Sequence, residues 1–333
     1  MIRGKKIVFR CNANAQLGWG HVRRCLNLAQ WLRGKYKVFF VINQEPAVCE
    51  YIKERGFPVF EISEKGTPEK VEERVLNTIL GFEPHIVVND VHDTTYEYMH
   101  TLKKHNIKCV NFDDSSKNVK MAQVVIDANR KEKENKCFGA DYIVLSSVYP
   151  KQAKKKRRLH KRVKSILISF GGSDPGDLAL KTLRSLDGRI PENIELLVTV
   201  GPSFQNREEL EKWGQEYNVV LLEKMDDLSQ LFLDVDLAVV SGGLTMYESL
   251  SLGTPTVVVA HNKGAAKNAR RMEKKGAVLY LGEGLKISDK KIMRKVNALI
   301  EDFPMREELS KNAKDVIDAK GVFRILEQIE MCM

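Results

Sequence analysis

The sequence lacks the residue spacings that are typical of metal and redox sites. Neither a C-x-x-C pair nor an H-E-x-x-H motif occurs in its 333 residues. The six cysteines are scattered along the chain: Cys11, Cys25, Cys49, Cys109, Cys137 and Cys332. Scattered cysteines in a chain of this size indicate reduced thiols that fill a core. No metal ion and no other cofactor is therefore expected.

Long apolar runs are absent as well. Runs such as TVVVA at 256–260 are far shorter than the ~20 residues that a membrane span needs. The first residues, MIRGKKIVFRCNAN, pass from charged residues directly into a short strand, without the apolar region of a signal peptide. With 43% hydrophobic and 29% charged residues, the composition is that of a globular protein. We expect a cytoplasmic location.

The net charge of +10 comes from one segment. KQAKKKRRLHKRVK at 151–164 contains nine Lys or Arg residues and no acidic residue, so the rest of the chain is close to neutral. The segment has no aromatic residues that could stack on bases. We therefore interpret it as a solvated basic linker and expect no nucleic-acid partner. The alternative is a tether to an anionic partner, for example the peripheral contact of this linker with an anionic membrane.

Strands and helices alternate through both halves of the chain. The expected strands are 6–10, 37–42, 58–62, 85–90, 108–112, 124–128 and 142–147, then 165–172, 194–201, 218–223, 235–243, 256–262 and 277–283. The expected helices are 21–33, 46–55, 67–80 and 94–104, then 176–186, 205–216, 226–233, 244–252, 265–275 and 288–301. The strands are rich in Val, Ile and Phe on both faces, which is typical of buried parallel sheets.

This pattern predicts an α/β protein with two doubly wound, Rossmann-like domains facing a central cleft, which is the GT-B architecture of nucleotide-sugar enzymes. We expect an N-terminal domain at 1–150 on the sugar or acceptor side, the basic linker at 151–164, and a nucleotide-binding domain at 165–333. Ligands of such folds bind at the carboxyl ends of the strands.

The most informative stretch is SGGLTMYESLSLGTP at 241–255. A strand ends at a loop and a helix follows, so backbone N–H groups at the helix start could bind a diphosphate. The loop residues are Ser241, Gly242, Gly243, Leu244 and Thr245. Glu248, about one turn into the helix, could accept hydrogen bonds from both ribose hydroxyls. A tight turn followed by an exposed glutamate explains the stretch equally well.

Two other stretches could contribute to the same site. In SFGGSDPGD at 169–177, Gly171 and Gly172 follow a strand. They could form a second anion-binding side of the site, or they could form a simple turn. DVD at 234–236 imitates a metal-binding D-x-D motif, but it precedes a buried strand and so lies at the wrong end of the sheet.

In AQLGWGHVRRCLNLAQ at 15–30, Gly18 and Gly20 precede His21 at the start of a helix. A dinucleotide-binding turn would need a third glycine, but Arg23 occupies that position. The positive end of the helix dipole favours a neutral imidazole, the form that a general base needs. We therefore interpret His21 as a catalytic base, with a histidine that only caps the helix as the alternative.

These stretches together resemble a known family. FRCNANAQLGWGHVRRCLNLA and VVSGGLTMYESLSLGTPTVVVAHNKGAAKNARRMEKKGA are similar to the UDP-sugar hydrolases of pseudaminic acid biosynthesis, to spore-coat polysaccharide proteins and to the lipid II-forming GlcNAc transferases. The resemblance covers nearly the whole chain and implies a GT-B fold, a UDP-sugar and no metal. By position it implies a catalytic role for His21 and a ribose contact for Glu248. It also implies that Ser241–Thr245 hold the diphosphate.

The chain departs from the family where the sugar is expected to bind. Asn12 stands where the family commonly has Asp, and the stretch from Asp90 to His92 replaces Asp-His-Tyr. Gly264-Ala265 replaces an Asn-Gln pair and leaves space, unless Asn262 or Lys267 turns inward to fill it. We therefore expect the nucleotide end of the site to be kept and the preferred sugar to differ.

The sequence thus predicts a metal-independent enzyme that cleaves the anomeric C–O bond of a UDP-sugar with water. An inverting glycosyltransferase with a sugar or lipid acceptor is the alternative in which a hydroxyl replaces water. A sugar-nucleotide sensor, in which His21 only binds, is the alternative without catalysis.

Overall fold

The computed structural model describes most of the chain. The described residues are 4–13, 19–113, 115–128, 137–172, 174, 176–201, 204, 206–216, 218–223, 225 and 227–333. They divide into two compact units, the first made of residues 1–147 and 320–333 and the second of residues 148–319. Gly18 lies outside the described residues.

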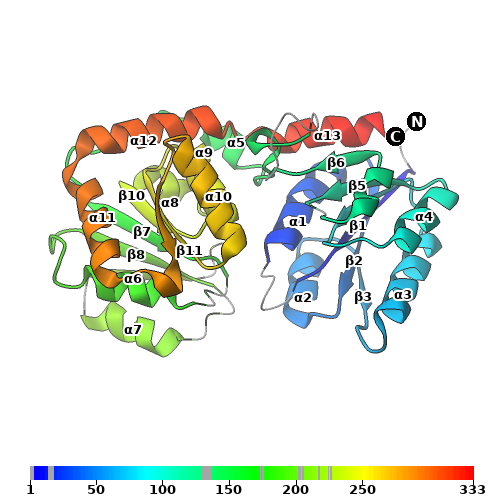
Figure 1. Cartoon of the computed structure of the whole chain (residues 1–333), viewed down its shortest axis with the longest axis horizontal. Coiled ribbons are helices and arrows are strands. Elements are labelled where there is room, and N and C mark those ends of the chain that lie inside the picture. The colour runs from blue at the N-terminus through cyan, green and yellow to red at the C-terminus, as the bar shows by residue number, and fades with distance from the viewer. Residues whose placement is uncertain are drawn as a thin grey trace. The chain divides into compact units, whose positions relative to one another are not determined.

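The first unit contains a six-stranded parallel sheet in the order β3-β2-β1-β4-β5-β6 (Figure 1). Its strands are β1 (Lys6–Cys11), β2 (Lys37–Asn43), β3 (Val59–Ile62), β4 (Ile86–Asp90), β5 (Lys108–Phe112) and β6 (Val124–Ile126). Its helices are α1 (Gly20–Leu32), α2 (Pro46–Glu54), α3 (Pro68–Gly81), α4 (Tyr96–Lys104) and α13 (Gly321–Met331). Alternate residues of β1 enter different cores because side chains of a strand point to opposite faces of the sheet. Ile7 and Phe9 pack on the α1 side, whereas Val8 packs on the side of α3 and α4.

The second unit contains another six-stranded parallel sheet, in the order β12-β11-β10-β7-β8-β9. Its strands are β7 (Ser165–Ser169), β8 (Glu195–Val200), β9 (Val219–Glu223), β10 (Leu237–Val240), β11 (Thr256–Ala260) and β12 (Leu279–Glu283). Its helices are α5 (Tyr149–Gln152), α6 (Leu178–Leu186), α7 (Arg207–Glu216), α8 (Ser229–Asp234), α9 (Leu244–Ser251), α10 (Lys263–Lys274), α11 (Asp289–Glu301) and α12 (Phe303–Val316). Two parallel sheets with helices on both faces confirm the predicted α/β fold class.

The order of strands places one switch point in each sheet. In the first sheet the chain runs from β1 outward through β2 to β3, then returns to β4 and runs outward through β5 to β6 on the other side. The switch point, where the direction reverses, therefore lies between β1 and β4. In the second sheet it lies between β7 and β10 by the same pattern. Loops at the carboxyl ends of these strand pairs form the crevice in which doubly wound sheets bind ligands.

The C-terminal helix α13 belongs to the first unit, although the sequence places 165–333 in one domain. Its buried residues Val322, Ile325 and Ile329 share one helix face and join the core that α1 also enters. Gly321 starts the helix where a Cβ atom would overlap the backbone of Ile143. The close approach of these two segments therefore requires glycine.

Residues 142–147, which the sequence predicts as a strand, form no strand in the structure. Tyr142 ends a short 3₁₀ turn, and an irregular segment follows it. Ile143, Val144 and Leu145 are nevertheless buried, which explains the apolar signal. The prediction was wrong because a buried run of this length has the same composition in a strand and in an irregular segment.

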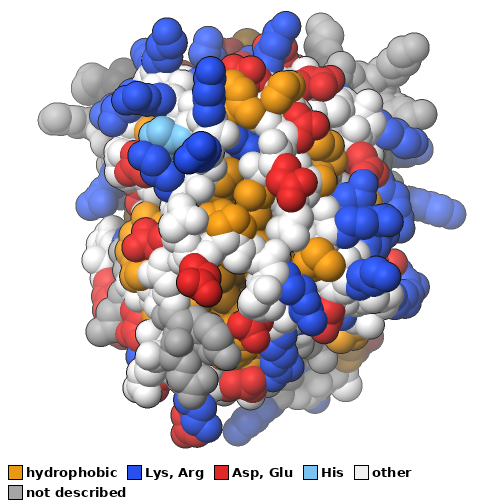
Figure 2. Space-filling view, turned by 90° about the vertical axis from the view of Figure 1, so that its left-hand side faces the viewer, with side chains coloured by type: hydrophobic (Ala, Val, Ile, Leu, Met, Phe, Trp, Pro, Cys, Tyr) orange, Lys and Arg blue, Asp and Glu red, His pale blue; other side chains and the backbone are white. Residues whose placement is uncertain are grey.

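The basic run at 151–164 is anchored to the second unit rather than solvated along its whole length. Arg157 donates hydrogen bonds to the backbone carbonyls of Phe232 and Val235, and His160 Nδ1 lies 2.9 Å from the buried carboxylate of Asp236. The other basic side chains of the run are exposed. On the face shown in Figure 2, Lys and Arg side chains lie among acidic and apolar ones rather than forming one continuous basic surface.

Within the described part of the chain, every helix is too short or too polar to cross a lipid bilayer. The same residues contain no group of three or more His, Cys, Asp or Glu side chains that could hold a metal ion.

Candidate functional site

His21 lies in the first turn of α1, at the carboxyl end of the sheet of the first unit. Gly20 is the first helical residue, and Trp19 precedes it without a side-chain cap. A Cβ atom added to Gly20 would meet open space, so this glycine leaves the approach to the helix start unobstructed. The side chain of His21 is 17% exposed, which leaves part of the imidazole accessible.

Asp90, the last residue of β4, holds the imidazole of His21. The distance from His21 Nδ1 to Asp90 Oδ1 is 2.6 Å, and the side chain of Asp90 is fully buried. A carboxylate can only accept a hydrogen bond, so Nδ1 carries the proton and donates it to Asp90. The other ring nitrogen, Nε2, is then the unprotonated one of the neutral imidazole and can accept a proton.

Arg24 supports the same carboxylate from the next turn of α1. Its Nε donates to Asp90 Oδ2 at 2.7 Å, its Nη2 donates to Asp90 Oδ1 at 2.5 Å, and its Nη1 donates to Asp113 Oδ2. Burial by itself would raise the pKa of Asp90, but the charge of Arg24 and the hydrogen bonds from Arg24 and His21 hold it well below its usual value. Burial likewise opposes the charge of Arg24, while Asp113 and Asp90 raise its pKa. Asp90 is therefore a carboxylate at neutral pH.

His92 adds a second imidazole at this point. Its ring lies 5.1 Å from the ring of His21, edge to face. Its Nδ1 lies 3.0 Å from the backbone oxygen of Asp113, which can only accept, so Nδ1 carries the proton here too. Together His21, Arg24, Asp90, His92 and Asp113 form what we call the histidine cluster. It lies at the switch point between β1 and β4, where a ligand is expected.

The loop from Ser241 to Thr245 lies at the corresponding switch point of the second unit, between the end of β10 and the start of α9. A Cβ atom at Gly242 would overlap the backbone oxygen of Ala265 in α10, whereas one at Gly243 would meet open space. Ser241 Oγ lies 2.5 Å from His261 Nδ1, and desolvation lowers the pKa of that histidine. The loop is thus packed at Gly242 and open at Gly243, and the unpaired N–H groups that a helix start usually has could bind an anion on the open side.

Glu248 lies in the second turn of α9 and is 7% exposed. The sequence left open an exposed glutamate without a ligand role, but the structure buries the side chain. A buried carboxylate requires hydrogen-bond donors around it, which suits a group that binds hydroxyls.

Gly171 and Gly172 follow β7, which pairs with β10, so this loop lies beside the Ser241–Thr245 loop. Gly171 has a φ of 83°, a conformation that favours glycine. Asp174 accepts hydrogen bonds from the N–H groups of Leu178 and Ala179 at the start of α6, at 2.9 and 2.8 Å. Burial outweighs these bonds and raises the pKa of Asp174 to about 6.

The other predicted contacts differ in their surroundings. Asn262 caps α10, where its side-chain oxygen accepts a hydrogen bond from Ala265 N at 2.8 Å. Asn12 follows β1 and lines a small pocket on the other side of the sheet from α1. Leu244 and Thr245 are half-buried at the start of α9.

Sequence reasoning missed three members of the histidine cluster: Arg24, Asp90 and Asp113. Arg24 could have been found, because residues three apart share a helix face and His21 was already identified. Asp90 and Asp113 end or follow β4 and β5, two neighbouring strands, so polar residues at both strand ends were a usable signal.

Comparisons with known proteins agree with this architecture. Residues 154–316 match the family described as Glycosyl transferases group 1. The crystal structure of MurG from Acinetobacter baumannii is similar over 98% of this chain and 99% of that chain, with a TM-score of 0.71 and 15% identity. A UDP-GlcNAc 2-epimerase from Neisseria meningitidis bound to UDP-GlcNAc is similar over 98% of this chain and its whole length, with a TM-score of 0.60 and 11% identity.

Three curated relatives match in sequence. An uncharacterized protein of Methanocaldococcus jannaschii is 30% identical over 78% of this chain, which spans only 56% of that relative. Spore coat polysaccharide biosynthesis protein SpsG of Bacillus subtilis is 24% identical over 92% of this chain and 93% of SpsG. The UDP-2,4-diacetamido-2,4,6-trideoxy-beta-L-altropyranose hydrolase of Campylobacter jejuni is 22% identical over 81% of this chain and 97% of the hydrolase.

The chain therefore has the GT-B fold. Residues 154–316 are similar to the glycosyltransferases of group 1, and the chain is similar to a protein of spore coat polysaccharide biosynthesis.

Proposed function

We propose that the protein cleaves the anomeric C–O bond of a UDP-sugar with water and releases UDP and the free sugar. The observation that carries this proposal is the contact between His21 and the buried carboxylate of Asp90. A proton on Nδ1 that is donated to Asp90 would leave Nε2 as the base, and the 17% exposure of the His21 side chain supports this role.

In the proposed reaction a water oxygen attacks the anomeric carbon and gives its proton to His21 Nε2. The bond from that carbon to the diphosphate oxygen breaks, and UDP leaves with the electron pair. The carboxylate of Asp90 stabilises the imidazolium that forms, in the way that a buried carboxylate supports a catalytic histidine elsewhere. Arg24 keeps the carboxylate ionised and oriented.

The nucleotide is assigned to the second unit. We expect the N–H groups at the start of α9 to hold the diphosphate and its developing negative charge. Glu248 would accept hydrogen bonds from the ribose hydroxyls one turn further along the helix. The burial of Glu248 supports this assignment over a solvated surface glutamate.

A glycosyltransferase is the second candidate. The match of 154–316 to group 1 glycosyltransferases favours it, while the relation to the Campylobacter hydrolase favours water as the acceptor. The same base would then take the proton of a sugar or lipid hydroxyl, so the geometry of the cluster fits both reactions.

The sugar is expected to differ from that of the Campylobacter hydrolase. His92 lies beside the base and presents an imidazole there, and Gly264 and Ala265 have no polar side chains with which to select sugar substituents. Competition between the altropyranose substrate and UDP-N-acetylhexosamines, compared by kcat/KM, tests this expectation. A hundredfold preference for the altropyranose substrate would contradict it.

Incubation of the protein with a panel of UDP-sugars, with and without added acceptors, tests the proposal itself. Free sugar and UDP without an acceptor support hydrolysis, and turnover that requires an acceptor supports transfer. Binding without turnover in either case would leave a nucleotide-sugar sensor.

A further inference from the structure

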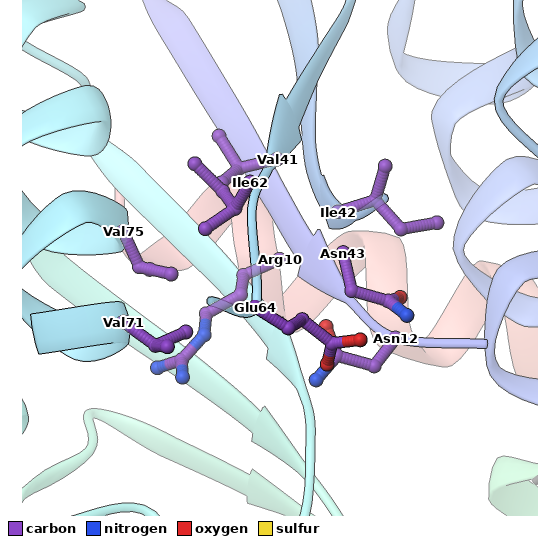
Figure 3. A pocket seen from close by; sticks show the side chains of 9 residues that line it. All are labelled: Arg10, Asn12, Val41, Ile42, Asn43, Ile62, Glu64, Val71 and Val75. Carbon is purple, nitrogen blue, oxygen red and sulfur yellow. The ribbon is translucent and has the colours of Figure 1, made fainter. Parts of the chain in front are cut away.

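A small pocket in the first unit lies outside the histidine cluster, on the face of the sheet that α3 covers. Arg10, Asn12, Asn43 and Glu64 line it at the carboxyl ends of β1, β2 and β3, together with aliphatic side chains (Figure 3). The aliphatic lining residues are Val41, Ile42, Ile62, Val71 and Val75. We call this the strand-end pocket.

The strand-end pocket contains a cation with an unmet hydrogen bond. Arg10 Nη1 is buried and has no hydrogen-bond partner among the described residues. The guanidinium lies over the ring of Tyr98, 4.1 Å from its centroid, so the ring covers one of its faces. A cation–π contact of this kind offsets only part of the cost of burying a guanidinium N–H without an acceptor.

No carboxylate of the described residues forms an ion pair with Arg10, although Glu64 lines the same pocket. The carboxylate of Glu64 lies toward Asn12 and Asn43, away from the guanidinium, and Glu64 is exposed (Figure 3). The end of the pocket at Arg10 is therefore positive and walled by Val71 and Val75.

One side of the pocket is held by hydrogen bonds of Asn43. Asn43 accepts a hydrogen bond from Ala13 N at 3.0 Å and donates one to Ala13 O at 2.9 Å, which holds the chain just after Asn12. The pocket encloses about 40 Å³. That is a few times the minimum of about 10–15 Å³ needed by one water molecule, so a small substituent fits, and a sugar ring that carries this substituent would lie outside the pocket.

We propose that the strand-end pocket binds a carboxylate group, with Arg10 as its ion-pair partner. A carboxylate supplies the acceptor that Arg10 Nη1 lacks, matches its charge and has a size suited to the volume. The carboxylate could belong to a free organic acid or to an acidic sugar, and the chemistry at Arg10 is the same for both. This binding does not depend on the proposed UDP-sugar reaction, and its test involves no turnover.

The test uses the full chain and acetate as the probe, with binding measured by saturation transfer from the protein to the methyl protons of acetate. We expect saturable binding that Arg10→Gln weakens at least about tenfold, because a charge-assisted hydrogen bond is lost. Val71→Phe fills the pocket while keeping the charge and should also weaken binding. Arg33→Gln, a change of another arginine in the same unit, is the matched control and should leave it unchanged. Glu64→Gln should leave binding unchanged or strengthen it, because a negative charge at the pocket is removed.

Two further arms identify the source of the carboxylate. Methyl glucuronoside that binds more tightly than acetate, with no binding of methyl glucoside, supports an acidic sugar. Equal affinity for acetate and the glucuronoside supports a free organic acid.

Three results would overturn the proposal. They are no acetate binding to the wild type, acetate binding that Arg10→Gln leaves unchanged while circular dichroism shows a folded variant, and inorganic phosphate binding in preference to acetate.

Discussion

Asp90→Asn is the substitution that examines the histidine cluster most closely, because it changes a charge and preserves the shape of the side chain. Asp90 accepts one hydrogen bond from His21 and two from Arg24. If an amide NH₂ group replaces the oxygen beside His21, it donates to Nδ1, so the ring proton moves to Nε2 and the base is lost. General-base catalysis contributes about 10²–10⁴-fold, so we expect kcat to fall by that factor. The affinity for UDP should stay near that of the wild type.

The same substitution should also destabilise the fold. Removing one partner of a buried ion pair costs about 3–5 kcal/mol, and Asp113 would be the remaining carboxylate that pairs with Arg24. Asp113→Asn is the matched control, because it removes the other carboxylate of Arg24 and leaves the contact of His21 with Asp90 in place. It should lower the free energy of unfolding as well, by a smaller amount because Asp113 is 15% exposed, while kcat stays within a few-fold of wild type.

The assay follows UDP release from whichever UDP-sugar the wild type turns over, alongside unfolding in urea for each variant. Two results would refute the reasoning. One is a folded Asp90→Asn variant with nearly wild-type kcat. The other is an Asp113→Asn variant that loses as much kcat as Asp90→Asn.

Three more predictions concern the second unit. Glu248→Ala should weaken UDP binding by roughly tenfold or more, as expected for hydrogen bonds to a buried charged group; unchanged affinity in calorimetry would remove the ribose assignment. Gly242→Ala should lower the free energy of unfolding by about 1–3 kcal/mol, because its Cβ overlaps the backbone of Ala265. Gly243→Ala should leave stability unchanged and weaken UDP binding, and equal urea midpoints for both variants would contradict this difference. The pKa of Asp174 is raised from 3.8 to about 6, so between these pH values the folded state keeps a proton that the unfolded chain loses. The free energy of unfolding should therefore fall by about 2–3 kcal/mol as the pH rises through this range. Asp174→Asn should flatten this part of the stability profile, and an unchanged slope would assign the effect to another group.

The fold could be predicted from the sequence because its strands are short apolar runs separated by amphipathic helices, which is a local signal. The destination of α13 could not be predicted in this way. The helices expected from the sequence end at residue 301, so α12 and α13 were both missed. The apolar face of α13 is typical of a helix that packs on a core, but it does not indicate which of two similar cores the helix enters. The apolar run at 142–147 was mistaken for a strand for a similar reason, because a buried irregular segment and a buried strand have similar amino-acid compositions.

The candidate site could be predicted only in part, because the position of His21 has a local sequence signal and its contacts do not. His21 could be singled out from its glycine context at a helix start. Its partnership with Asp90 depends on the pairing of β1 with β4, which brings together residues 69 positions apart. Similarly, the role of Asn262 as a helix cap depends on where α10 begins, a boundary that the sequence placed two residues later.

The proposed role of His21 is that of a base in the cleavage of a UDP-sugar. The most direct measurement is mass spectrometry of the products after wild type and His21→Ala are each incubated with a panel of UDP-sugars without acceptor. We expect UDP and free sugar from the wild type, with kcat lower by about 10²–10⁴ in His21→Ala and UDP affinity close to wild type. A His21→Ala variant that releases free sugar within a few-fold of the wild-type rate would contradict it.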